Sequence, residues 1–150
     1  MNLDKKKVLS NALDICEKKI QDLQFEMHTL ITDASNDTKS SAGDKHETSR
    51  ALMQLEQEKL QQQLSLLQLY KEELLKIDPN SQHESIRLGS IVMCEKETFF
   101  ISIPFGRTEF ENTTIFLISP QSPLGKALIG KKEKDEVEFN QRTYCIIEVA

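Results

Sequence analysis

Between Leu9 and Leu30 the apolar residues of this chain recur at alternating intervals of four and three. The positions that share this spacing are Leu9, Leu13, Cys16, Ile20, Leu23, Met27 and Leu30. An unbroken alternation of this kind predicts a long helix that packs along a coiled-coil seam. A second apolar helix face is needed to cover the apolar face of this helix.

A second helical stretch begins near Thr48 and continues to about Ile77, without Pro or Gly. Leu, Gln, Glu and Lys, which are good helix formers, dominate it. Its apolar face is broader and is formed by Met53, Leu60, Leu64, Leu67 and Leu74. Two polar residues, Gln57 and Lys71, occupy seam positions within that face. The sequence Asp78-Pro79-Asn80 then predicts the end of the helix.

The segment between the two stretches, ITDASNDTKSSAGDKHET, is rich in Ser, Thr, Asp and Asn, and predicts a solvated turn. Two helices of similar length joined by such a turn favour an antiparallel hairpin within one chain, here residues 1–78. Regular heptads also occur in coiled coils between molecules. A helix from Leu3 to Thr32 is about 45 Å long, so we expect an acidic tip near residues 33–47 at the far end of the hairpin.

After Pro79 the pattern changes to short runs rich in Ile, Val, Phe and Thr, which predict an antiparallel sheet in residues 79–150. The runs are Gly89 to Cys94, Thr98 to Ile103, Thr114 to Ile118, Val137 to Phe139 and Tyr144 to Val149. The segment from Ser122 to Lys132 starts with Ser-Pro and predicts one short helix on that sheet. The fold class is therefore α+β.

Composition limits the possible functions. The net charge of −5 argues against a protein that grips nucleic acid through its whole surface, because phosphate binding needs clustered Lys and Arg. Cys16, Cys94 and Cys145 are far apart in the sequence and show no zinc-ligand spacing, so we expect reduced thiols. No apolar run is long enough to cross a bilayer, and the first residues do not resemble a secretory signal. We therefore expect a cytoplasmic protein that does not bind membranes.

The sequence SPQSPLGKALIGKKEKDEVE, from Ser119 to Glu138, resembles the C-terminal signature of the Gre transcript-cleavage factors, GreA and GreB. Gly43 to Glu47 resembles the family's hairpin tip, Gly-Asp, two residues, then Glu. The resemblance implies that residues 79–150 form a sheet domain like that of FK506-binding proteins. One departure is visible: Thr48 to Ala51 stand where familiar members have Asn-Ala-Glu and an aromatic residue.

The resemblance implies that Asp44 and Glu47 help hold a Mg²⁺ ion shared with RNA polymerase. On a first helical turn, their spacing of three places both carboxylates on one face. Spacing alone favours another interpretation, in which Asp44 caps the helix and Glu47 reaches back to its amide. The match to the family tip favours the metal role.

The remaining expected contacts are with the polymerase and its RNA. The resemblance implies that Ser122, Pro123 and Leu124 dock on the rim of the polymerase's secondary channel. Lys39, Lys45 and Arg50 are candidates for contact with RNA or the channel wall, and equally for plain surface charges.

The resemblance thus implies an accessory factor, not an enzyme, that stimulates the polymerase's own cleavage of backtracked RNA. Its partners are bacterial RNA polymerase and the nascent RNA, it binds no cofactor alone, and we expect a monomer. The alternative is a Gre-like regulator that occupies the same channel without stimulating cleavage. A prolyl isomerase is disfavoured, because such enzymes need an aromatic-lined pocket and the chain has no Trp.

Overall fold

The computed structural model describes residues 3–37 and 44–150, and side chains for residues 3–33 and 47–150. These residues divide into two compact units. We call Asp14–Glu72 the helical unit, and Met1–Leu13 with Glu73–Ala150 the sheet unit. Each is described by itself.

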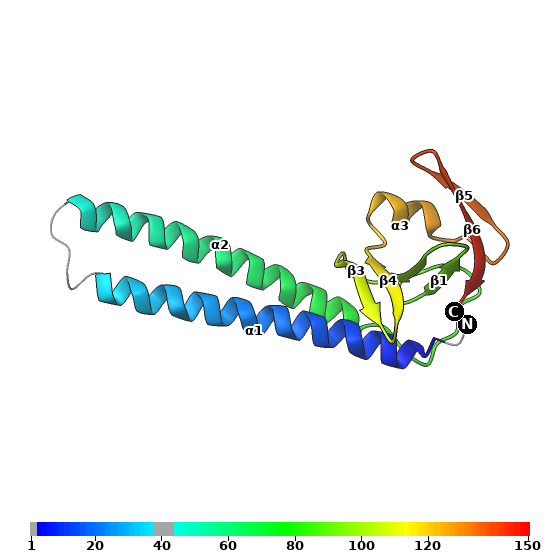
Figure 1. Cartoon of the computed structure of the whole chain (residues 1–150), viewed down its shortest axis with the longest axis horizontal. Coiled ribbons are helices and arrows are strands. Elements are labelled where there is room, and N and C mark those ends of the chain that lie inside the picture. The colour runs from blue at the N-terminus through cyan, green and yellow to red at the C-terminus, as the bar shows by residue number, and fades with distance from the viewer. Residues whose placement is uncertain (1–2, 38–43) are drawn as a thin grey trace. The chain divides into compact units, whose positions relative to one another are not determined.

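The helical unit contains most of α1 (Lys5–Asp37) and most of α2 (Asp44–Leu75), which lie side by side in it (Figure 1). The seam residues Cys16, Ile20 and Leu23 are buried, as are Leu60 and Leu64 of α2. The predicted helical hairpin is therefore confirmed, and its two helices belong to one chain. No helix among the described residues is long and apolar enough to cross a membrane.

Two contacts join α1 to α2 within the helical unit. The Cys16 thiol donates to the carbonyl of Leu67 at 3.4 Å, and Lys71 Nζ lies 2.8 Å from Glu17 Oε2. The ion pair explains how a lysine occupies a seam position, because its charge reaches a carboxylate on the facing helix. Hydrogen bonding to Glu17, followed by the charge of Glu17, raises the pKa of Lys71.

Both helices are longer at the turn than the apolar pattern predicts. Helix α1 continues to Asp37 instead of ending near Thr32, and α2 begins at Asp44 instead of near Thr48. Once nucleated, a helix gains one hydrogen bond per added residue, so its backbone continues beyond its apolar stripe.

The sheet unit contains a six-stranded sheet in the order β3-β4-β2-β1-β6-β5. Its strands are β1 (Ile91–Cys94), β2 (Thr98–Ile101), β3 (Gly106–Phe110), β4 (Thr113–Ile118), β5 (Glu136–Phe139) and β6 (Arg142–Val149). The α+β class is confirmed. The expected all-antiparallel pairing is wrong at one place, since β2 and β4 are parallel, with Thr98 opposite Ile115. The chain forms the edge strand β3, which was not predicted, before it returns beside β2 as β4.

The short helix α3 (Pro123–Leu128) confirms the expected helix, although it ends four residues earlier than predicted. Its Leu128 is fully buried in the core of the sheet unit. The buried members of that core are Ile86, Val92, Cys94, Phe99, Ile101, Leu128, Val137, Tyr144 and Ile146.

Candidate functional site

The acidic residues predicted at the hairpin tip lie at the start of α2. Asp44 is its first residue and Glu47 follows one turn later. Glu47 is exposed, whereas the side chain of Asp44 lies outside the described ones. Since residues three apart lie on one face of a helix, the backbone meets the condition under which both carboxylates serve one site.

The basic residues expected near this end are described only in part. Arg50 is exposed and lies on α2 one turn beyond Glu47. Lys39 lies outside the described residues, and only the backbone of Lys45 is described. The structure therefore brings Glu47 and Arg50 together on one stretch of helix.

Two carboxylates are too few to hold a metal ion alone, but they can add ligands to an ion that another protein shares. The described residues contain no group of three or more His, Cys, Asp or Glu side chains arranged to hold a metal. Mg²⁺ takes oxygen ligands in a near-octahedral shell and keeps several waters, so one or two carboxylates suffice when other ligands come from elsewhere. Asp44 and Glu47 fit that requirement.

Ser122, expected in a docking region, has a defined structural role. Its backbone is extended, with φ −65 and ψ 156, and its Oγ accepts a hydrogen bond from the Gly125 amide at 3.0 Å. The same hydroxyl donates to the carbonyl of Ser119 at 2.7 Å. Ser122 is thus the N-cap of α3, which satisfies an amide that the first turn would leave unpaired.

The exposed side of α3 differs from the predicted docking residues. Leu124 packs against the core, whereas Pro123 is exposed. Lys126, one turn after Pro123 on α3, is also exposed, as is Ile129, the C-cap residue that follows the helix. Pro123, Lys126 and Ile129 are therefore the exposed residues of the segment from Pro123 to Ile129. The spacing of three from Pro123 was an available sequence signal for Lys126.

A buried hydrogen-bond chain at the start of the sheet unit was not predicted. His83, 8% exposed, places Nδ1 2.6 Å from Ser90 Oγ and Nε2 3.0 Å from Ser81 Oγ. Burial, then the charges of Lys5 and Arg87, lower the pKa of His83 to about 4. The ring is therefore neutral near pH 7 and serves packing rather than proton transfer.

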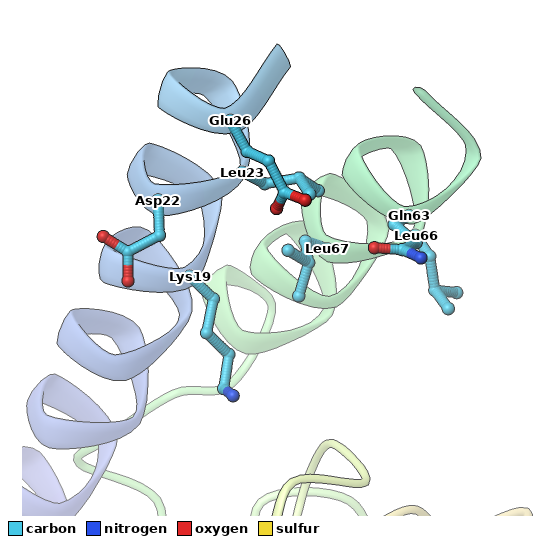
Figure 2. Close-up of a pocket in the computed structure, with 7 residues that line it drawn as sticks. All are labelled: Lys19, Asp22, Leu23, Glu26, Gln63, Leu66 and Leu67. Atoms are coloured by element: carbon cyan, nitrogen blue, oxygen red, sulfur yellow. The ribbon is translucent and has the colours of Figure 1, made fainter. Parts of the chain in front are cut away.

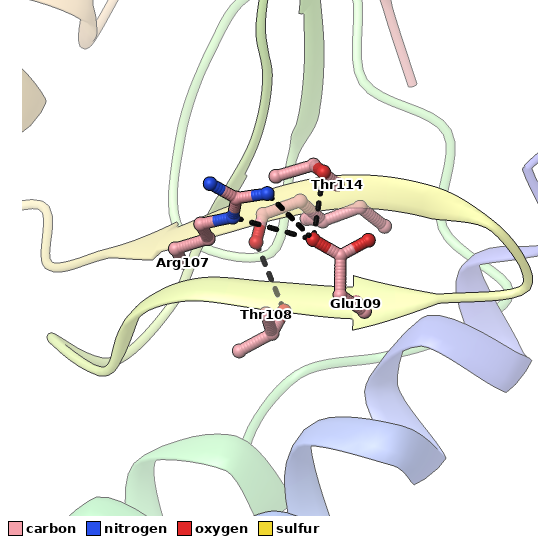
Figure 3. Close-up of polar contacts among 5 residues, drawn as sticks. Arg107, Thr108, Glu109 and Thr114 are labelled. Atoms are coloured by element: carbon pink, nitrogen blue, oxygen red, sulfur yellow. Dashed lines mark hydrogen bonds and ion pairs between the residues drawn. The ribbon is translucent and has the colours of Figure 1, made fainter.

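The β3–β4 hairpin carries a small polar cluster at the edge of the sheet (Figure 3). Glu109 Oε1 accepts from Arg107 Nη2 at 3.2 Å and from Thr114 Oγ1 at 2.9 Å. Thr108 Oγ1 donates to the carbonyl of Ile115 at 2.9 Å. These bonds satisfy the groups locally, and an exposed ion pair of this kind contributes little stability.

Comparisons with known proteins identify a family for part of the sheet unit. Residues 81–150 match a family model described as "Transcription elongation factor, GreA/GreB, C-term". A comparison with curated proteins found no significant match.

Two solved structures align with most of the chain. One, of the transcription factor Gfh1, is 17% identical, covers 91% of this chain and 92% of its own, and has a TM-score of 0.35. The other, a crystal structure of GreA factor homolog 1 (Gfh1) of Thermus thermophilus, is also 17% identical, covers 95% and 92%, and has a TM-score of 0.36. At these scores the assignment rests on the family match alone. Residues 81–150, just under half of the chain, thus match the C-terminal domain of the GreA/GreB family of transcription elongation factors.

Proposed function

We propose that this protein acts on bacterial RNA polymerase and stimulates cleavage of backtracked RNA, using Asp44 and Glu47 at the tip of its hairpin. The observation that carries the proposal is the placement of both acids on the first turn of α2, with Glu47 exposed. The family match of residues 81–150 to elongation factors supports the choice of partner.

The two carboxylates supply ligands that the polymerase site lacks. Bound Mg²⁺ supplies charge stabilisation and activates water in phosphodiester cleavage. Asp44 and Glu47 would offer oxygen ligands to that ion, since their backbone positions lie three residues apart on the first turn of α2. This protein would therefore complete a site without being an enzyme itself.

The hairpin suits a narrow channel. Two adjacent helices measure about 20 Å across, which is narrower than most globular domains. The bond from Cys16 to Leu67 and the ion pair between Lys71 and Glu17 hold the helices together without the help of a partner. Removal of a short 3′ RNA piece would place a new end at the catalytic centre and let synthesis resume.

Two further surfaces complete the proposal. The exposed residues Pro123, Lys126 and Ile129, on and just after α3, are the candidates for docking of the sheet unit on the polymerase. Lys39, Lys45 and Arg50 balance the acidic tip and contact RNA or the channel wall.

The test adds the protein to purified backtracked elongation complexes and follows RNA length. We expect the RNA to shorten with the unaltered protein, and not with Asp44→Asn combined with Glu47→Gln, while polymerase binding is retained. Glu58→Gln is the matched control, because Glu58 is an exposed acid elsewhere on α2. Slower synthesis without shortened RNA would reject cleavage stimulation and indicate a channel-blocking regulator.

A further inference from the structure

Helix α2 carries a second row of leucines outside the seam. Leu52 and Leu55 are each 62% exposed, Leu66 is 47% exposed and Leu69 is 50% exposed. Figure 2 shows Leu67 between the two helices, and Leu66, which lines the same pocket, farther from α1 on α2. Single exposed leucines are common, but a regular row of them marks a surface for association.

This row repeats at heptad spacing. Its members, which we call the outer stripe, are Leu52, Leu55, Lys59, Gln62, Leu66 and Leu69. The intervals are three, four, three, four and three, so these residues share one face of the helix. A stripe of this kind is complete only when another helix packs along it.

The intervals between residues of the outer stripe are the same in both directions along the helix. The midpoint of the stripe lies between Leu60 and Gln61. If a second copy of α2 runs antiparallel about that midpoint, Leu52 meets Leu69 of the copy, and Leu55 meets Leu66. Lys59 then meets Gln62 of the copy.

Neighbouring charges agree with this register. In the antiparallel arrangement Glu56 faces Gln63 of the copy, and Glu58 faces Ser65. No like charges oppose one another across these positions. In a parallel arrangement, by contrast, each Lys59 would face the Lys59 of the other copy, with a repulsive cost.

We propose that two copies of this protein associate through the outer stripe of α2, in an antiparallel and twofold-symmetric arrangement. Symmetric pairing uses the same patch on both copies, which is what a stripe with mirrored spacing provides. The stripe is about 27 Å long, so the interface falls at the small end of specific interfaces, and we expect a dimer that dissociates on dilution. The expected monomer is then the form present in dilute solution.

The first test measures association of the full chain by sedimentation equilibrium over a range of concentrations. We expect a monomer–dimer equilibrium, and a fall of at least about tenfold in the association constant for Leu55→Gln. Leu75→Gln is the matched control, because Leu75 is a 63% exposed leucine on α2 outside the stripe. A chain that stays monomeric throughout, or an equal effect of both substitutions, overturns the proposal. Circular dichroism establishes that each variant folds.

The second test establishes the register and leaves every leucine intact. Lys59→Cys and Gln62→Cys are made separately in a Cys145→Ser background, because Cys145 is the partly exposed native thiol. Mild oxidation of the mixture is expected to join one variant to the other, through a disulfide between the two introduced thiols, faster than either variant couples to itself. Faster self-coupling of Lys59→Cys would show a parallel arrangement and contradict the proposal. Neither test contains polymerase, so the outcome is independent of the proposed function.

Discussion

The Cys16 thiol donates a hydrogen bond to the backbone carbonyl of Leu67, which lies 51 residues later in the chain. Cys16 is completely buried, and Glu17 beside it pairs with Lys71. The seam of the helical unit thus combines apolar burial with two specific cross-helix contacts. Such contacts set the register in which α1 lies against α2, because the apolar residues alone permit other alignments.

Cys16→Ala is expected to lower the free energy of unfolding of the hairpin by about 1–2 kcal/mol, since it leaves a small cavity and removes the hydrogen bond to the Leu67 carbonyl. Urea denaturation followed by circular dichroism measures the change. Lys18→Ala is the control, because Lys18 is exposed and its ion pair with Asp22 contributes only a few tenths of a kcal/mol. Equal stability of the two variants would contradict the assigned role of Cys16.

Gly125→Ala is expected to destabilise the sheet unit by about 1–3 kcal/mol or more, through overpacking. A Cβ at this position would lie 2.0 Å from the carbonyl oxygen of Ser119. Gly130→Ala is the comparison, because nothing lies within 4 Å of its Cβ and only its φ of +83 opposes a side chain. Thermal unfolding should show the larger loss for Gly125→Ala, and a larger loss for Gly130→Ala would refute the close-contact argument.

The buried His83 should make stability depend on pH between about 4 and 6.5. Its pKa is about 4 in the folded protein and near 6.5 when unfolded, so the unfolded chain takes up the proton first as pH falls. Stability contributed by the neutral ring is therefore present above pH 6.5 and is lost as pH falls towards 4, with a slope of at most about 1.4 kcal/mol per pH unit.

His83→Gln keeps a polar side chain and removes the titration. The difference in unfolding free energy between wild type and variant should shrink as pH is lowered from 7 to 5. A difference that is constant over this range would show that His83 titrates normally.

The helices were predictable from sequence because the seam of α1 is regular. Its spacing identified Cys16, Ile20 and Leu23, and all three are buried. Helix ends were less predictable, since the backbone of α1 continues to Asp37 after its apolar residues stop.

The missed strand has a physical explanation. β3 contains Arg107 and Glu109, both exposed, and its alternating burial reflects an edge position with one neighbour. It offers no run of large apolar residues, so its signal resembled a loop. Because β3 was not predicted, nothing in the sequence suggested a chain path that returns β4 parallel to β2.

The sequence predicted which residues form the candidate site, but it did not predict how they are arranged in space. The spacing of Asp44 and Glu47 was compatible with a single turn, and α2 begins at Asp44. The docking segment was harder, because periodicity does not tell Leu124, packed against the core, from Ile129, which is exposed. The sequence of α2 likewise contains two interleaved heptad rows. Only the structure shows that one row forms the seam and that the other forms the exposed outer stripe.

The dependence of RNA cleavage on Mg²⁺ concentration tests the role of the tip acids most directly. Cleavage rates in backtracked complexes are measured across a Mg²⁺ titration with wild type, Glu47→Gln and the control Glu58→Gln. If Glu47 helps hold the ion, its variant needs at least several-fold more Mg²⁺ for half-maximal rate, while Glu58→Gln follows wild type. Identical Mg²⁺ curves for all three proteins would contradict the proposed function of the tip.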